Sequence, residues 1–234
     1  MEIYQGIGLD NKRCQIEDDY AFGDLCINCQ TYGLTSMLRL LDIRANWTPT
    51  ILEHFMEFSN ASIPETVNVL VAFIDIQGLR TISDALKDPV KLFSFLDSWA
   101  KIVIKEVEGT DGKVLKFIGD ECLIVFPDQS ADSGIQTLLS AKRKVEKYFK
   151  SLGYANKVRI TAHYGEAAIG EFGAGTCRNL DVIGETVNTA AGLGRGEHRG
   201  QLIISSQAFR KLSPVTRKRF HKYTPPIVYL AEDE

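Results

Sequence analysis

From residue 67 onward, apolar strands alternate with long amphipathic helices, and this alternation limits the possible folds more than any other feature. Residues 67–74 are rich in β-branched and aromatic side chains, which predicts a buried strand. Apolar residues recur at helical spacing in residues 89–108 and 131–152, which predicts two long helices. The other predicted elements are a hairpin of residues 114–118 and 122–126, paired strands at 158–164 and 166–172, strands at 201–204 and 227–230, and short helices at 184–193 and 205–212. Hairpins mixed with helical crossovers favour an α+β fold, in which helices pack on a mostly antiparallel sheet.

The sequence pattern of residues 1–64 differs from the alternation of strands and helices in the rest of the chain. Thr48 followed by Pro49 is typical of the start of a helix, and apolar side chains then recur at helical spacing. Residues 60–64 contain small and polar side chains and a proline, which indicates a linker. We therefore predict an N-terminal helical extension over residues 1–64 and a larger domain over residues 65–234.

The composition favours a cytoplasmic protein that binds neither nucleic acid nor membrane. The formal net charge of −3 provides no basic field to attract polyanions. The N-terminus is acidic and lacks the apolar segment of a signal peptide, and no apolar run is long enough to span a membrane. The sparse cysteines are typical of reduced thiols in a cytosol. Cys26 and Cys29 have the spacing of half a zinc site, and Cys14 lies nearby. A four-ligand site needs one more residue, and His54 is the only histidine in this part of the sequence, so free thiols are favoured.

Two aspartates follow apolar strands. Asp75 ends the strand of residues 67–74, and Asp120 follows Gly119 at the tip of the predicted hairpin. Each alone is commonly a turn or capping residue. Together, two carboxylates at strand exits can meet at one edge of a sheet and hold two divalent cations about 3.5–4 Å apart, as in phosphoryl-transfer sites. Mg²⁺ suits such a site because phosphate oxygens and water complete its coordination shell.

Four short motifs occur in order along residues 71–191. They are Val71-Ala-Phe-Ile-Asp75-Ile-Gln-Gly78, Lys116-Phe-Ile-Gly-Asp120, His163-Tyr-Gly165-Glu-Ala-Ala-Ile-Gly170 and Asp181-Val-Ile-Gly184-Glu-Thr-Val-Asn188-Thr-Ala-Ala191. In order and spacing they resemble the catalytic domain of class III adenylyl and guanylyl cyclases, and the resemblance extends from about residue 67 to the C-terminus. It implies a ferredoxin-like fold and a phosphorus–oxygen lyase, which converts a nucleoside triphosphate into a 3′,5′-cyclic monophosphate and pyrophosphate.

The resemblance also implies roles for individual residues. Asp75 and Asp120, with Ile76, would bind two Mg²⁺ or Mn²⁺ ions, and Asn188 would position the ribose. The segment implied to hold the phosphates consists of Ile76, Gln77, Gly78, Leu79 and Arg80. Because this family forms its site between two chains, a homodimer is implied, with metals from one subunit and base and ribose contacts from the other.

Lys116 and Asp181 match the pair that reads the purine edge in this family. The adenylyl branch uses lysine with aspartate or threonine, whereas the guanylyl branch uses glutamate and cysteine. Lysine only donates and aspartate only accepts hydrogen bonds, which complements the ring-nitrogen acceptor and amino donor of adenine. ATP is therefore the favoured substrate.

Two departures from the family pattern leave alternatives open. Gly192 stands where an arginine usually stabilises charge on the reacting phosphate, and losing such a donor typically costs about 10²–10³ in rate. Arg195 is the candidate replacement, and Arg80 is an unusual residue beside the phosphate segment. One alternative is a pyrimidine cyclase that makes cyclic UMP or CMP in antiviral (antiphage) defence, as some stand-alone bacterial relatives do. The other is a degenerate cyclase that acts as a nucleotide-binding regulatory module.

The remaining candidates carry less weight. Residues 118–121 resemble the turn of diguanylate cyclases, but that family does not account for residues 181–191. His163 lies on an apolar strand and is predicted to be a core residue. Cys122 and Cys177 have no histidine or aspartate partner at a meaningful spacing, which gives no support for nucleophilic catalysis.

Overall fold

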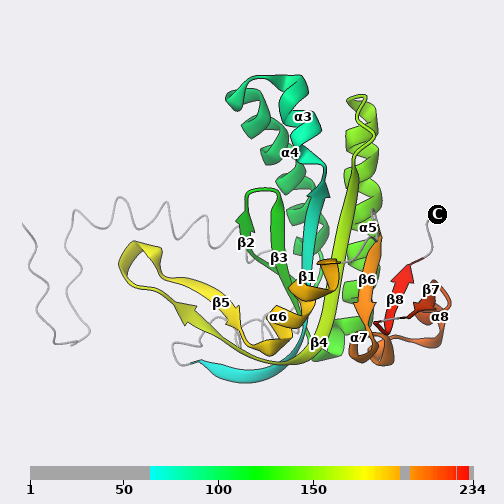
Figure 1. The fold of residues 1–234 in the computed structure, drawn as a ribbon. Coiled ribbons are helices and arrows are strands. Elements are labelled where there is room, and N and C mark those ends of the chain that lie inside the picture. Colours follow the sequence, from blue (N-terminus) through cyan, green and yellow to red (C-terminus); the bar gives the residue numbers. More distant parts are fainter. Residues whose placement is uncertain (1–63, 196–200, 225, 232–234) are drawn as a thin grey trace, which may run out of the picture. The chain divides into compact units, whose positions relative to one another are not determined.

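The computed structural model describes residues 64–195, 201–224 and 226–231 (Figure 1). The predicted N-terminal extension, with its cysteines and its helix, lies outside these residues apart from Pro64, so the boundary between the two predicted domains stays a prediction. No helix in the described ranges is long and apolar enough to cross a membrane.

The described strands form one mixed sheet in the order β2-β3-β1-β4-β6-β8-β7, with β5 paired to β4. Every pairing is antiparallel except that of β4 with β6. The strands are β1 (Glu65–Gln77), β2 (Lys113–Ile118), β3 (Glu121–Pro127), β4 (Lys157–Phe172), β5 (Asn179–Ile183), β6 (Leu202–Ser205), β7 (Phe220–Tyr223) and β8 (Val228–Ala231). The predicted α+β architecture with a mostly antiparallel sheet is confirmed.

The two long predicted helices are present and pack on one face of this sheet. The helices are α3 (Leu79–Leu86), α4 (Pro89–Glu108), α5 (Ala131–Ser151), α6 (Glu185–Gly192), α7 (Ser206–Lys211) and α8 (Pro214–Arg217), with 3₁₀ turns η1 (Asp128–Ser130), η2 (Gly175–Cys177) and η3 (Leu193–Arg195). Asp88 caps α4, because its Oδ1 accepts hydrogen bonds from the backbone N–H groups of Val90 and Lys91 at 2.8 and 3.3 Å.

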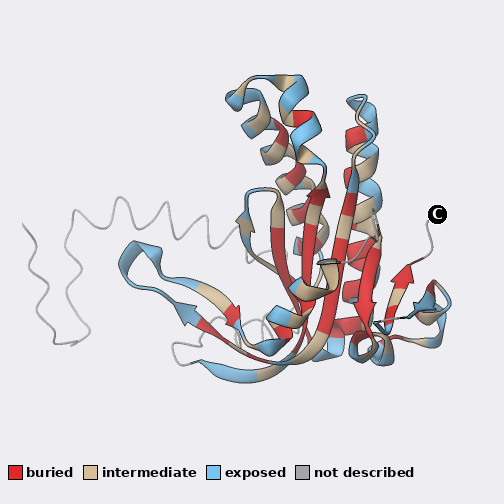
Figure 2. Ribbon diagram, viewed as in Figure 1, coloured by how far each residue is buried: buried red, intermediate tan, exposed pale blue. Residues whose placement is uncertain are grey.

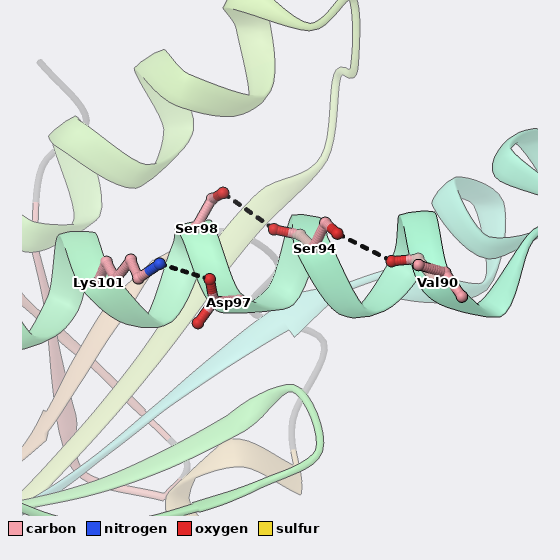
Figure 3. A network of polar contacts seen from close by, with 5 residues as sticks. All are labelled: Val90, Ser94, Asp97, Ser98 and Lys101. Atoms are coloured by element: carbon pink, nitrogen blue, oxygen red, sulfur yellow. Dashed lines mark hydrogen bonds and ion pairs between the residues drawn. The ribbon is translucent and has the colours of Figure 1, made fainter.

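Several polar side chains of α4 form hydrogen bonds and an ion pair within the helix (Figure 3). The hydroxyls of Ser94 and Ser98 donate to the carbonyls of Val90 and Ser94, both at 2.9 Å, and Lys101 pairs with Asp97 at 2.6 Å. Pairs of this kind on an exposed helix contribute only a few tenths of a kcal/mol, typically about 0.3–0.5. Asp97 is therefore a suitable position for control substitutions.

Alternate residues of β1 lie on opposite faces of the sheet. Leu70, Ala72 and Ile74 belong to the core cluster formed with α4 and α5, whereas Val69, Val71 and Phe73 belong to a second cluster that includes Ala190 of α6. We call this second side the open face. The buried centre of the sheet is visible as the red segments of β1, β3 and β4 in Figure 2. Because side chains alternate along a strand, Asp75 continues the series of Phe73 and lies on the open face.

The prediction of two paired strands at 158–164 and 166–172 is wrong. These residues form the single strand β4, which pairs with β1 along the whole length of β1. Gly165 permits close packing here instead of a turn, since a Cβ at this position would lie 2.6 Å from Thr186 Oγ1 on α6. The sequence analysis also did not predict α3, α8, β5 or β7.

Phe126 on β3 lies between two glycines, and this packing yields a stability prediction. A Cβ at Gly112 would lie 2.3 Å from Phe126 Cε1, and one at Gly134 on α5 would lie 2.6 Å from Phe126 Cγ. Replacing glycine by alanine inside a helix normally stabilises by roughly 0.5–1 kcal/mol. For Gly134→Ala we expect the opposite, a loss of about 1–3 kcal/mol in the free energy of unfolding, because the core would be overpacked.

Urea unfolding of the purified variants checks this expectation. The matched control is Gly192→Ala at the end of α6, where an added Cβ meets no atom outside its own helix within 4 Å. The control should be neutral or slightly stabilising. Equal stability of Gly134→Ala and the wild type would contradict the proposed clash.

Candidate active site

The candidate site lies at the end of β1 on the open face. The strand register sets Asp75 opposite Glu121 on β3 and opposite Arg159 on β4. The backbone N–H of Ile76 donates to the carbonyl of Asp120 at 3.3 Å, which ties the β2–β3 turn to the end of β1. The backbone therefore brings together the two segments that carry the predicted metal ligands.

Negative charge is concentrated at this point. Burial raises the pKa of Asp75 above its usual value, the Arg159 guanidinium opposes that rise, and the carboxylate of Asp120 adds to it. Burial and then the charge of Asp75 likewise raise the pKa of Glu121. A pKa raised in this way means that the ionised carboxylates lack sufficient compensating positive charge. A bound cation would supply that compensation.

The donor set fits a hard divalent ion that arrives with a phosphate ligand. In the described ranges, no three His, Cys, Asp or Glu side chains are grouped closely enough to form a complete protein cage for a metal. Mg²⁺ commonly uses only one or two carboxylates and completes its shell with water and substrate phosphates. Asp75 and Asp120 therefore match a nucleotide-linked metal site better than a structural one.

The segment predicted to hold phosphates forms a tight turn between β1 and α3. Gly78 adopts φ 73°, a conformation that favours glycine. The amide Nδ2 of Asn156 donates to the carbonyls of Gln77 and Gly78 at 2.9 and 2.8 Å, which anchors the turn. Leu79 begins α3, and the side chain of Arg80 is 93% exposed, with only a long contact of 3.8 Å to Asp84. The sequence analysis missed Asn156, since nothing local marks it as a partner of this turn.

The two predicted base-reading residues contact each other. Lys116 Nζ donates to Asp181 Oδ2 at 2.6 Å, so β2 and β5 are joined across 65 residues of sequence. Asp181 Oδ1 accepts a second hydrogen bond from the backbone N–H of Val182 at 2.9 Å. This second bond orients the carboxylate. The side chain of Lys116 is 43% exposed and that of Asp181 is 16% exposed, so Lys116 is the more accessible member of the pair.

The residues implied for ribose and transition-state contacts lie on α6 and η3. Asn188 is exposed, and its amide Nδ2 is 3.5 Å from Glu185 Oε2. Gly192 is the last residue of α6, and Arg195 ends η3, with its side chain outside the described part. Within the described protomer, no hydrogen bond joins Asn188 to Asp75 or Asp120.

Arg159 is another residue that sequence reasoning missed. Its Nη2 donates to Asp75 Oδ2 at 2.8 Å, and its Nη1 donates to the carbonyl of Gly194 at 2.7 Å. It stands between Val158 and Ile160, which are both fully buried. The only signal in the sequence was a charged residue within an apolar strand.

Two other predictions concern side chains away from this site. His163 is buried, as predicted, and its Nδ1 is 2.8 Å from Ser205 Oγ. Cys122 and Cys177 are free thiols, and burial raises the pKa of Cys122 to about 12. A thiol with such a pKa is a poor nucleophile at neutral pH, which agrees with the absence of a predicted role.

The sequence of this chain matches a known family model and several curated proteins. Residues 62–228 match the model of the adenylate and guanylate cyclase catalytic domain. An adenylate cyclase of Anabaena cylindrica is 25% identical over 158 residues, which are 63% of this chain and 31% of that protein. The chain thus spans less than a third of the length of the curated relatives that it matches.

Solved structures show the same fold. The adenylyl cyclase CyaB from P. aeruginosa has a TM-score of 0.63 at 18% identity, covering 74% of this chain and 97% of that chain. The guanylyl cyclase Cya2 has a TM-score of 0.58 at 20% identity, covering 72% and 92%. Because both base specificities occur on this fold, its backbone alone does not determine the base. The family match covers most of the chain, and the chain belongs to the class III adenylate and guanylate cyclase catalytic domain family.

Proposed function

We propose that this protein is a cytoplasmic nucleotidyl cyclase that converts a nucleoside triphosphate, preferably ATP, into a 3′,5′-cyclic monophosphate and pyrophosphate. The observation that carries the proposal is the meeting of the Asp75 and Asp120 segments at one end of the open face. In the reaction, the ribose 3′-oxygen forms a bond to the α-phosphorus, the bond from that phosphorus to the pyrophosphate oxygen breaks, and the 3′-hydroxyl proton passes to solvent.

Each group in the site has a part in this reaction. Asp75 and Asp120 would hold two Mg²⁺ or Mn²⁺ ions, which supply activation of the 3′-hydroxyl and charge neutralisation on the phosphates. The turn at Gly78, anchored by Asn156, would present backbone N–H groups to the phosphates. Arg159 provides a cation beside Asp75, with which it pairs at 2.8 Å. Asn188 would orient the ribose.

A homodimer is part of the proposal. The far part of β4 and its partner β5 form an arm that extends from the body of the domain (Figure 1). On this arm the apolar side chains of Phe172 and Ile183 are 62% and 52% exposed. Exposed apolar side chains on a protruding hairpin are typical of a protein–protein contact. As the resemblance to the cyclase family implies, a homodimer would place Asn188 of one protomer opposite Asp75 of the other.

Adenine specificity is proposed from Lys116 and Asp181, and it leads to a substitution test. The double variant Lys116→Glu with Asp181→Cys should shift the ratio of kcat/KM for GTP over ATP by roughly tenfold or more, because the donor and acceptor pattern is exchanged. Both residues are changed together because they pair at 2.6 Å, and a single change would leave one charge alone.

Steady-state kinetics with each nucleotide measures this ratio. Lys101→Glu on the outer side of α4 is the control, and it should leave the ranking unchanged. An unaltered ranking in the double variant, with activity retained, would show that this pair does not read the base.

The primary test is product identification. Purified protein is incubated with Mn²⁺ or Mg²⁺ and separately with ATP, GTP, CTP and UTP, and the products are identified by mass spectrometry. Cyclic AMP supports the proposal. Cyclic UMP or CMP would favour the pyrimidine cyclase alternative and a role in antiviral defence. Bound nucleotide without any product would favour the regulatory-module alternative, for which the absence of an arginine at Gly192 is the supporting observation.

A further inference from the structure

Asn156 contacts both sides of the turn that follows β1. It immediately precedes β4, and its amide Nδ2 donates to the carbonyl of Gln77 at 2.9 Å and to that of Gly78 at 2.8 Å. One amide group carries two N–H bonds, which match these two neighbouring acceptors. A Cβ at Gly78 would lie 3.3 Å from the same Nδ2, so the amide packs directly on the turn.

The two carbonyls belong to different elements, and Gly78 is the joint between them. Gln77 ends β1 and pairs with Lys157 on β4. The carbonyl of Gly78 also accepts the backbone N–H of Thr81 at 3.0 Å, at the start of α3. Each carbonyl is thus held within its own element, whereas the angle between the two elements depends on the backbone of Gly78, and glycine permits many conformations. Asn156 bridges the joint and fixes this angle.

The segment that carries Asn156 is itself held on both sides by α5. The backbone N–H of Tyr154 donates to the carbonyl of Phe149 at 3.0 Å. The backbone N–H of Val158 donates to Glu146 Oε1, also at 3.0 Å. A donor on a segment that is held in this way keeps the turn in one orientation before any ligand binds.

The direction of the two carbonyls sets the direction of two N–H groups. In a planar trans peptide, the carbonyl of one residue and the N–H of the next residue point to opposite sides. The carbonyls of Gln77 and Gly78 point toward Asn156. The N–H groups of Gly78 and Leu79 therefore point away from it. Because Asn156 lies on the β4 side of β1, the Gly78 N–H points to the β3 side, to which the turn with Asp120 belongs.

We propose that Asn156 is a positioning residue, which holds the N–H groups of Gly78 and Leu79 in the orientation that binds the phosphates of the substrate. The inference rests on the proposed function, because it requires a triphosphate at this end of the open face. The first N–H groups of a helix have no partners within the helix, and they bind phosphate when they are directed at it. Without Asn156, these N–H groups must be ordered when the phosphates bind, and this ordering weakens the affinity.

Binding of tripolyphosphate to the full chain, measured by isothermal titration calorimetry in excess Mn²⁺, tests this role. Tripolyphosphate has neither base nor ribose, so its affinity reports on the phosphate-binding segment. Asn156→Ala should bind it roughly tenfold more weakly than the wild type does, because the polar groups of the turn are no longer ordered in advance. The affinity for Mn²⁺ alone, measured by electron paramagnetic resonance, should not change, because Asp75 and Asp120 are intact.

A matched control separates positioning from a general loss of stability. Ser140→Ala removes a hydrogen bond of similar length, 2.7 Å to Glu106, which joins α5 to α4. Its affinity for tripolyphosphate should equal that of the wild type. Urea unfolding of both alanine variants shows how much stability each of them loses.

A second variant serves if Asn156→Ala does not fold. Asn156→Asp keeps the shape of the side chain, but an ionised carboxylate cannot donate to the two carbonyls. Ala155→Asp adds the same charge at the neighbouring exposed residue and is the control for charge repulsion. Asn156→Asp should lose more affinity for tripolyphosphate than Ala155→Asp does.

The outcomes distinguish this role from the proposed function. If Asn156→Ala bound tripolyphosphate as tightly as the wild type, or if Ser140→Ala lost as much affinity, the positioning role would be refuted and the two-metal proposal would stand. The same conclusion would follow if Asn156→Asp lost no more affinity than Ala155→Asp. If the wild type bound tripolyphosphate no more tightly than Asp75→Asn does, the two-metal proposal would fail, and the positioning role with it.

Discussion

Replacing Asp75 or Asp120 by asparagine is expected to lower cyclic nucleotide formation by at least about 10³-fold. Metal ions at such a site supply several kcal/mol of transition-state stabilisation, and each 1.36 kcal/mol corresponds to a factor of about ten in rate. Asparagine keeps the side-chain volume but removes the charge that attracts a cation. Mass-spectrometric quantification of product from each purified variant, with saturating Mn²⁺, measures the effect.

Two controls distinguish a loss of catalysis from a loss of folding. Asp97→Asn breaks the surface pair with Lys101 and should change turnover less than twofold or so, since exposed pairs contribute little. Because the pKa of Asp75 is raised in the folded protein, its ionised form costs folding free energy at neutral pH. Asp75→Asn should therefore unfold at a similar or higher urea concentration. Substantial product from either pure aspartate variant would contradict the two-metal assignment.

Replacing Phe126 by alanine is expected to lower the free energy of unfolding by about 3–5 kcal/mol. The ring is 0% exposed and belongs to the core between the sheet and the long helices. Gly112 and Gly134, which both lie against the ring, have no side chains that could move into the vacated space. Urea unfolding, monitored by circular dichroism, measures the loss.

The surrounding glycines provide an internal check on this explanation. In a Phe126→Ala background, the added methyl of Gly134→Ala no longer meets the ring, so most of its cost should disappear. A double-mutant cycle quantifies that coupling. Phe93→Ala, at a residue that is 74% exposed on α4, is the control and should cost less than about 0.5 kcal/mol. A Phe126→Ala variant as stable as this control would refute the packing argument.

The spacing of apolar residues was sufficient to predict those helices and strands that have a long apolar repeat. The helices at 89–108 and 131–152 and the strand at 67–74 were predicted because burial of one face, or of both, leaves a periodic trace in the sequence. The same reasoning failed for α3, because its short sequence includes Arg80, Thr81 and Ser83 and only Ile82 is buried. It also divided β4 into strands at 158–164 and 166–172, although Gly165 between them serves close packing against α6 and not a turn.

The fold class, the family and the two aspartates after apolar strands could be predicted without a structure, because they depend on periodicity and on residue order along the chain. Only the tertiary structure set Glu121 and Arg159 beside Asp75, paired Lys116 with Asp181, and joined Arg159 to Gly194. These contacts depend on the strand register and on segments far apart in the chain. A shift of one residue in strand register would move the side chains of a strand to the other face of the sheet. The local sequence of a strand does not determine its register with strands that lie far away in the chain.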